Sequence, residues 1–180
     1  SPYAVSKAAS DEYLQMAMKV YGLKATVLRC NNTYGRKRER GFFVEYLITS
    51  MLNGHSVYVG SPDHVRDYMW VDDHVNAYLL SMKKSAEGQV FNVSPGNPIS
   101  NINLARKLGE IVNFKGQIIE GSYPPGYPMR SPKLDTNYIL LDSSKIMKRL
   151  GWKPTVTLDR GLIMATDYWR SQEHKHVENQ

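Results

Sequence analysis

A tyrosine and a lysine four residues apart stand at the start of the chain, in the segment YAVSK from Tyr3 to Lys7. On a helix, residues i and i+4 project from the same face, one turn apart. A cationic ammonium close to a phenol favours the phenolate, so such a pair can move a proton to and from a hydroxyl group. Tyr-x-x-x-Lys alone also describes an ordinary helix-surface pair, so its meaning depends on the surrounding sequence.

The composition indicates a globular protein with an anionic partner. The 180 residues are 42% hydrophobic with a mean hydropathy of −0.45, and no apolar run is long enough to span a membrane. No basic-then-apolar leader occurs, and the single cysteine, Cys30, excludes an internal disulfide. We therefore expect a cytoplasmic location without membrane contact. The net charge of +6 favours an anionic partner, which could be a nucleotide-type ligand or nucleic acid.

Helical and strand-like segments alternate along the chain, which predicts an α/β fold. Expected helices cover 2–21, 42–53, 72–84, 100–113, 143–150 and 158–171, and expected strands cover 24–30, 56–60, 89–94 and 117–121. We expect Asp72 or Asp73 to cap the third helix and Ser100 the fourth. Residues 122–132 are expected to form a loop, and 173–180 a frayed polar tail.

The 180 residues contain neither Gly-x-Gly-x-x-Gly nor Gly-x-x-Gly-x-x-Gly, and the first predicted element is a helix. A dinucleotide-binding half needs such a turn to bring a helix N-terminus against a pyrophosphate. The sequence therefore predicts the later part of a larger fold.

Four segments, taken in order, carry a family resemblance. They are SPYAVSKAASDEYL (1–14), LRCNNTYG (28–35), VRDYMWVDDHVNAYL (65–79) and FNVSPG (91–96), the last followed by a helix and by LDSSKIMKRLGWKP (141–154). Together they resemble the C-terminal half of an extended short-chain dehydrogenase/reductase, of the NAD-dependent nucleotide-sugar epimerase/dehydratase family. The resemblance implies the last elements of a Rossmann-type doubly wound sheet plus a small C-terminal substrate-binding α/β domain.

The same resemblance implies where these parts lie. Residues 1–35 would be the C-terminal remnant of the NAD-binding domain, with the catalytic helix and the following strand. Residues 36–172 would be mainly the substrate-binding domain, with elements returning to the Rossmann sheet at about 65–95. The frayed tail would follow at 173–180.

The resemblance also implies residue roles around NAD, most of whose site would be missing from this chain. Tyr3 would be the general acid/base that takes a proton from a sugar hydroxyl while hydride passes to NAD. Lys7 would support it and hydrogen-bond the nicotinamide ribose. Cys30 and Asn31 match positions near the nicotinamide carboxamide, although Cys30 is equally well explained as a small buried hydrophobe.

Asn32 and Arg66 match residues that contact the substrate diphosphate, a task suited to a planar, always-charged guanidinium. As alternatives, Asn32 is a common turn residue and Arg66 could pair with Asp63 or Asp67. Asn92 and Arg130 match further nucleotide- or phosphate-contacting positions, and Phe43, Val57 and Val59 match positions around the base. An ordinary core role explains these three apolar residues equally well.

Other polar clusters carry weaker signals. The basic run Arg36, Lys37, Arg38 and Arg40 is typical of a solvated face, although it could attract an anionic substrate. No aromatic residues interleave with it and no nucleic-acid motif occurs, so we expect no nucleic-acid partner. The histidines are scattered without ligand spacing, so we expect no metal site.

The sequence thus predicts part of an enzyme that acts on a nucleoside-diphosphate sugar and resembles UDP-glucose 4-epimerase, with this chain inactive by itself. Two alternatives stay open: a nucleotide-sugar 4,6-dehydratase, and a non-catalytic module that binds nucleotide sugars or dimerises. Helix 2–21 has apolar residues on two stripes, which favours a homodimer.

Overall fold

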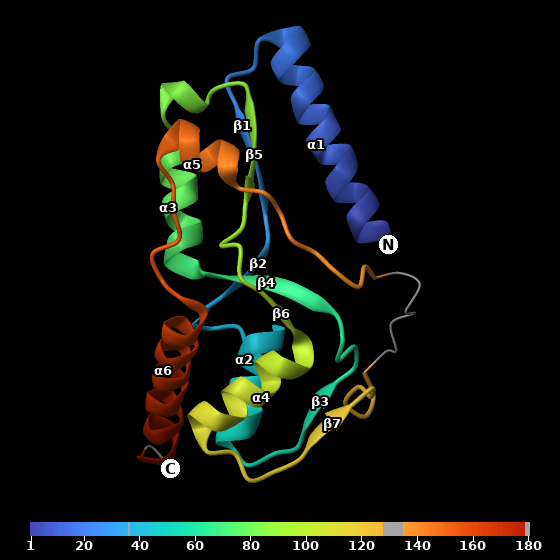
Figure 1. Cartoon of the computed structure of the whole chain (residues 1–180), viewed down its shortest axis with the longest axis vertical. Helices are drawn as coiled ribbons and strands as arrows, with labels where there is room; N and C mark the ends of the chain where they lie inside the picture. Colours follow the sequence, from blue (N-terminus) through green and yellow to red (C-terminus); the bar gives the residue numbers. More distant parts are fainter. Residues whose placement is uncertain (36, 128–134, 179–180) are drawn as a thin grey trace.

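The computed structural model describes residues 1–35, 37–127 and 135–178 (Figure 1). The helices are α1 (Pro2–Tyr21), α2 (Phe43–Leu52), α3 (Val71–Ser81), α4 (Asn101–Val112), α5 (Ser144–Leu150) and α6 (Leu158–Glu178), with a short 3₁₀ helix η1 (Lys84–Ala86). The strands are β1 (Thr26–Cys30), β2 (Asn32–Tyr34), β3 (Val57–Val59), β4 (Val65–Trp70), β5 (Gln89–Val93), β6 (Pro98–Ser100) and β7 (Ile118–Glu120). The predicted α/β class is confirmed.

The strands form small sheets that are mostly parallel. β1 pairs with β5, β2 with β4, and β3 with β7, each in parallel, while β6 joins β4 antiparallel. In Figure 1 the β1–β5 pair lies between α1 on one side and α3 and α5 on the other. Parallel pairs need crossover connections, and helices supply them here.

Two hydrophobic cores meet at β4. The lower core in Figure 1 lies among α2, α4, α6 and β3, and the upper core lies among β5, α3 and α5. Because side chains alternate along a strand, Tyr68 and Trp70 enter the lower core whereas Met69 enters the upper one. β4 is therefore shared between both halves of the structure.

The caps of α4 agree with the sequence. Ser100 Oγ accepts a hydrogen bond from the Asn103 amide at 3.3 Å, which confirms it as the N-cap. At the other end, Asn113 closes the helix in the left-handed conformation at φ 55°. Asparagine tolerates this conformation better than most residues because its short side chain can bond locally.

The predicted cap of α3 was wrong. The helix begins one residue earlier, after Trp70, without a side-chain cap. Asp72 accepts from Trp70 Nε1 at 2.9 Å, and Asp73 accepts from the Thr155 amide (2.9 Å), Thr155 Oγ1 (2.6 Å) and the Val156 amide (3.1 Å). The neighbouring Trp70 indole therefore occupies Asp72, and donors 82 and 83 residues away occupy Asp73, so neither carboxylate caps the first turn of α3.

The last helix also differs from the prediction. α6 continues to Glu178 instead of ending near Ser171, so the frayed tail expected from residue 173 was wrong for 173–178. The three-residue strands β2 and β6 were not among the expected elements, because runs this short show no periodicity. The division into parts at residue 35 stays a prediction.

Asp73 gives a stability prediction. It is 2% exposed, and its carboxylate satisfies three donors from the segment before α6. Asp73→Ala leaves these donors unpaired, so we expect the free energy of unfolding to fall by roughly 2–4 kcal/mol. Urea denaturation followed by circular dichroism measures this. Asp63→Ala, at an exposed position, is the control, and an equal small loss in both variants would contradict the assignment.

Candidate functional site

Tyr3 and Lys7 lie on one face of α1, as their spacing predicts. The Lys7 ammonium stands 6.0 Å from the centroid of the Tyr3 ring, and Tyr3 is 71% exposed. α1 is held to β1 by the ion pair between Asp11 and Arg29 at 2.5 Å, and this arginine lowers the pKa of the Asp11 carboxyl. The Tyr3 and Lys7 side chains are therefore accessible to a ligand that lies along α1.

Arg66 is a nearly buried cation on β4. Its Nη1 donates to the Val65 carbonyl at 2.8 Å, and its Nη2 donates to Asp135 Oδ1 at 2.9 Å. His64 Nδ1 lies 3.4 Å from the other oxygen of Asp135. The sequence left open an ion pair between Arg66 and Asp63 or Asp67. Arg66 does form an ion pair, but its partner, Asp135, lies 69 residues further along the chain, so the predicted partners were wrong.

Asn32 begins β2, the strand that pairs with β4, and its role at a diphosphate stays a prediction. Asn32 stands opposite Tyr68 in the β2–β4 register and hydrogen-bonds its side chain. Tyr68 and Arg66 are two residues apart on β4, so they share a face. Burial raises the pKa of the Tyr68 hydroxyl, while the charge of Arg66 and the bond to Asn32 act against that rise. This hydroxyl donates to Asn101 Oδ1 at 3.0 Å.

Asp67 organises the other face of β4. It is 1% exposed and accepts from the amides of Gly96 (2.7 Å) and Asn97 (3.1 Å) and from Ser94 Oγ. Asn31 Nδ2 donates to the same Ser94 hydroxyl at 2.5 Å. The residue matched to the cofactor side is therefore linked to the strand that carries Arg66. Sequence analysis missed this network, since its members come from separate segments.

The remaining predicted residues are scattered. Cys30 is half-buried at the end of β1, and Asn92 is half-buried opposite Arg29, on the sheet face toward α1. Val57 and Val59 are fully buried in the lower core, which accounts for their type, and Phe43 packs against that core. Their contact with a base stays a prediction. Arg130 and Arg36 lie outside the described residues.

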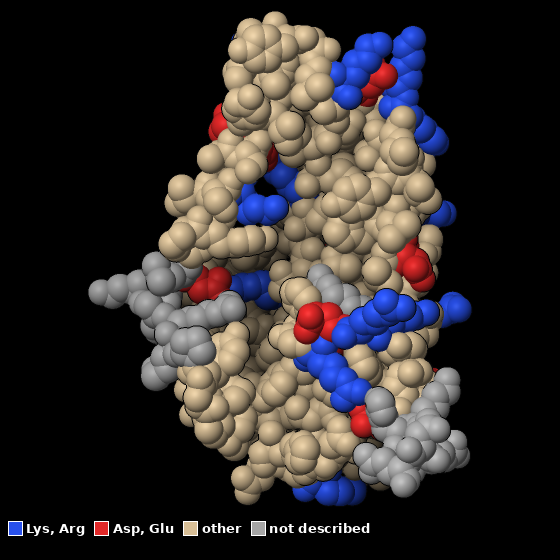
Figure 2. All heavy atoms as spheres, turned by 180° about the vertical axis from the view of Figure 1, so that it is seen from behind, with Lys and Arg blue, Asp and Glu red and all other residues tan. Residues whose placement is uncertain are grey.

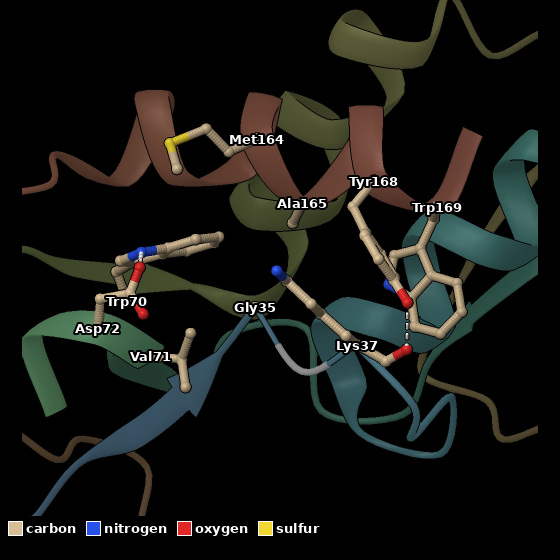
Figure 3. A pocket seen from close by; sticks show the side chains of 9 residues that line it. All are labelled: Gly35, Lys37, Trp70, Val71, Asp72, Met164, Ala165, Tyr168 and Trp169. Carbon is tan, nitrogen blue, oxygen red and sulfur yellow. Dashed lines mark hydrogen bonds between the residues drawn. The ribbon is translucent and has the colours of Figure 1, made fainter. Parts of the chain in front are cut away.

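A cavity of about 210 Å³ lies elsewhere, between the turn after β2, the start of α3 and α6 (Figure 3). The Lys37 side chain points into it beside Trp70, and Tyr168 donates its hydroxyl proton to the Lys37 carbonyl at 2.6 Å. Its walls are Gly35, Lys37, Trp70, Val71, Asp72, Met164, Ala165, Tyr168 and Trp169. Of the residues that the resemblance assigns, none in the described part of the chain lines it.

Two residues of the basic run, Lys37 and Arg40, contact α6. Lys37 lies 5.6 Å from the Tyr168 ring centroid, and Arg40 stacks on Trp169 at 5.0 Å while pairing with Glu173 at 2.9 Å. Figure 2 shows basic side chains in several separate groups on this face. The arrangement favours a solvated, locally paired surface over a continuous nucleic-acid track.

Residues 1–35, 37–127 and 135–178 contain no group of three or more histidine, cysteine, aspartate or glutamate side chains that could hold a metal ion. Within the same residues, none of the helices is both long and apolar enough to cross a membrane.

Comparison with known proteins decides the family. The family described as GDP-mannose 4,6 dehydratase matches residues 1–165. The chain belongs to the NAD-dependent nucleotide-sugar epimerase/dehydratase family. The family's dTDP-glucose 4,6-dehydratase 1 of Escherichia coli K12 is 30% identical over 188 residues, covering 99% of this chain and 50% of that protein. The chain thus spans about half the length of the curated relatives it matches.

Solved structures of epimerases in this family share the fold. UDP-glucose 4-epimerase from Thermotoga maritima, solved with UDP-glucose, is 33% identical with a TM-score of 0.83, covering 96% of this chain and 54% of that one. UDP-glucose 4-epimerase from Thermus thermophilus, solved with NAD, is 28% identical with a TM-score of 0.79, covering 94% of this chain and 54% of that one. The resemblance drawn from the four sequence segments is therefore confirmed.

Cys30 gives a prediction about reactivity. Burial raises the pKa of its thiol to about 11. The thiolate is the nucleophile, so at pH 8 we expect iodoacetamide to label Cys30 about a hundredfold more slowly than an exposed thiol. Labelling should accelerate as the pH rises toward that value, which mass spectrometry can follow. The same chain in guanidinium chloride is the control, and equal rates in both states at pH 8 would contradict the prediction.

Proposed function

We propose that this chain provides the acid/base pair and the diphosphate-binding residues of an NAD-dependent nucleoside-diphosphate-sugar epimerase similar to UDP-glucose 4-epimerase. The observation that carries the proposal is Arg66, a nearly buried guanidinium on β4, the strand that pairs with the one beginning at Asn32. A fixed guanidinium suits a phosphate because its planar fork donates in a set direction. The T. maritima relative, solved with UDP-glucose, supports the ligand class.

In this proposal, the residues that transfer the proton lie on α1. The Tyr3 phenol would take the proton from a sugar hydroxyl, and the adjacent Lys7 ammonium would stabilise the phenolate that begins this transfer. NAD, when bound, supplies the hydride acceptor. The exposed Tyr3 and Lys7 side chains fit a cofactor and a sugar lying along this helix, and Cys30 and Asn31 would lie on the cofactor side.

The binding of NAD needs more than these residues. The 180 residues lack a glycine-rich turn for a pyrophosphate. We therefore propose that a protein of these residues alone does not interconvert nucleotide sugars. With its single half-buried cysteine, it fits the reducing cytoplasm that we propose as its location.

A 4,6-dehydratase is the second candidate. The matching family description and the E. coli relative carry that name, whereas the T. maritima structure is an epimerase at slightly higher identity, 33% against 30%. Proton removal from a sugar hydroxyl by Tyr3 would open either reaction. A non-catalytic module that binds nucleotide sugars is the third candidate, and it would use Arg66 and Asn32 alone.

Self-association is a separate prediction. Within α1 only Ala17 is buried, while Tyr13 and Val20 are 65% and 63% exposed. A second copy could cover this apolar face, so we expect a dimer or larger oligomer in sedimentation at tens of micromolar. Tyr13→Glu should shift it toward monomer, whereas Lys19→Glu, off the apolar stripe, should not. A wild-type monomer at these concentrations would refute the proposed homodimer.

Diphosphate binding tests the main proposal. Arg66→Ala should weaken the binding of nucleoside diphosphates by roughly tenfold to a hundredfold, because a charge-assisted hydrogen bond to phosphate is lost. Arg66→Lys should restore only part of the affinity, since an ammonium keeps the charge but not the fork. Affinity should also fall as salt rises. Calorimetry with UDP, GDP, CDP and dTDP measures the loss and ranks the bases.

The control is an arginine in an exposed ion pair. Arg106 pairs with Glu120 at 2.9 Å on the surface, so Arg106→Ala should leave the affinity unchanged. If Arg66→Ala binds a diphosphate as well as the wild type does, Arg66 is only an ion-pair partner. If the wild type binds none of the four at millimolar concentration, the chain has no preorganised diphosphate site.

A further inference from the structure

The guanidinium of Arg66 has one nitrogen turned inward and one covered by a carboxylate. Nη1 donates to the Val65 carbonyl, and Nη2 donates to Asp135 Oδ1 at 2.9 Å. The Arg66 side chain is 9% exposed and that of Asp135 is 41% exposed. Asp135 is therefore more exposed to solvent than the guanidinium that it pairs with.

The backbone holds Asp135 in this place. The segment that follows it adds to the start of β4, because the Val65 amide donates to the Asn137 carbonyl at 2.8 Å and the Ile139 amide donates back to Val65 at 3.2 Å. Val65 and Tyr138 form a parallel bridge. The Thr136 amide also donates to Asp135 Oδ1 at 2.9 Å. The carboxylate thus faces Arg66 as part of an ordered segment.

We infer that Asp135 is an internal competitor for the anion site at Arg66, which rests on the proposed function of that site. A carboxylate and a phosphate require the same charge-assisted hydrogen bond from Nη2. A diphosphate must therefore displace Asp135 or bind beside it against like-charge repulsion. Without ligand, Asp135 neutralises a cation whose burial would be unfavourable if it were unpaired.

This arrangement selects among anions by charge. A singly charged anion gains little by replacing a tethered carboxylate, since the ion pair that it forms resembles the one it breaks. A diphosphate carries more charge and more acceptor oxygens, and it can reach Asn32 from the same face. Asp135 therefore raises the threshold for binding and favours ligands that bear a diphosphate.

The test uses inorganic pyrophosphate, which has neither base nor ribose, alongside UDP. Asp135→Asn removes the charge but keeps the size of the side chain, so pyrophosphate should bind about tenfold more tightly, as measured by calorimetry. Asp135→Ala should show the same gain, and it guards against an effect peculiar to asparagine. In the double variant Arg66→Ala, Asp135→Asn, the gain should disappear.

The matched control is Asp167→Asn. Asp167 pairs with Arg170 on the surface of α6 at the same 2.9 Å, so this variant removes one negative charge from an ion pair that does not involve Arg66 and should leave affinity unchanged. If Asp135→Asn binds pyrophosphate as well as the wild type does, or more weakly, the inference that Asp135 competes with the anion is overturned. Asp135 would then be a residue that positions Arg66. If Arg66→Ala leaves binding intact, the proposed diphosphate site fails. If no variant binds pyrophosphate, both fail.

Discussion

Two oppositely charged neighbours, Arg66 and Asp67, are buried side by side on β4, and the rest of the structure is arranged to satisfy them. Successive side chains of a strand point to opposite faces, so the two cannot neutralise each other. Arg66 takes its carboxylate from Asp135, and Asp67 takes its donors from the turn after β5. Because an unpaired buried charge is strongly destabilising, the burial of β4 depends on both distant segments.

Buried carboxylates join the two cores of the molecule. Asp67 links β4 to the β5–β6 turn, and its partner Ser94 reaches both Asn31 and Ser143. Asp73 links α3 to the segment before α6 in the same way, through backbone amides and a hydroxyl. Neither has a cation among the partners described for it. Amide donors at fixed positions set the register of the segments they belong to, whereas a flexible lysine would set only a distance.

The sequence predicted those structural features that depend on residues close together along the chain. The helix from Pro2 to Tyr21 follows from its pattern and its closing glycine, and Ser100 caps α4 because its oxygen competes only with its own first turn. The prediction that Asp73 caps α3 was wrong because its carboxylate accepts hydrogen bonds from donors 82 and 83 residues away, which rules based on neighbouring residues do not consider. The ion pair between Asp135 and Arg66 was not predicted for the same reason. The family resemblance pointed to Arg66 and Asn32 as diphosphate-contacting residues, which stays a prediction, whereas the partners of Arg66 were seen only in the three-dimensional structure.

The two parts of the proposed site differ in how firmly they are held. Arg66 lies on a strand shared by both cores, so its direction is fixed by packing and by the Val65 carbonyl. Tyr3 and Lys7 lie on a helix whose single buried residue is Ala17 and whose described ion pair joins Asp11 to Arg29. Binding tolerates small displacements, but proton transfer does not, since a misplacement of about 1 Å can cost about a hundredfold in rate. In the proposed function, diphosphate affinity would therefore rest on β4, whereas proton transfer by Tyr3 would require the exposed face of α1 to be covered and held in place.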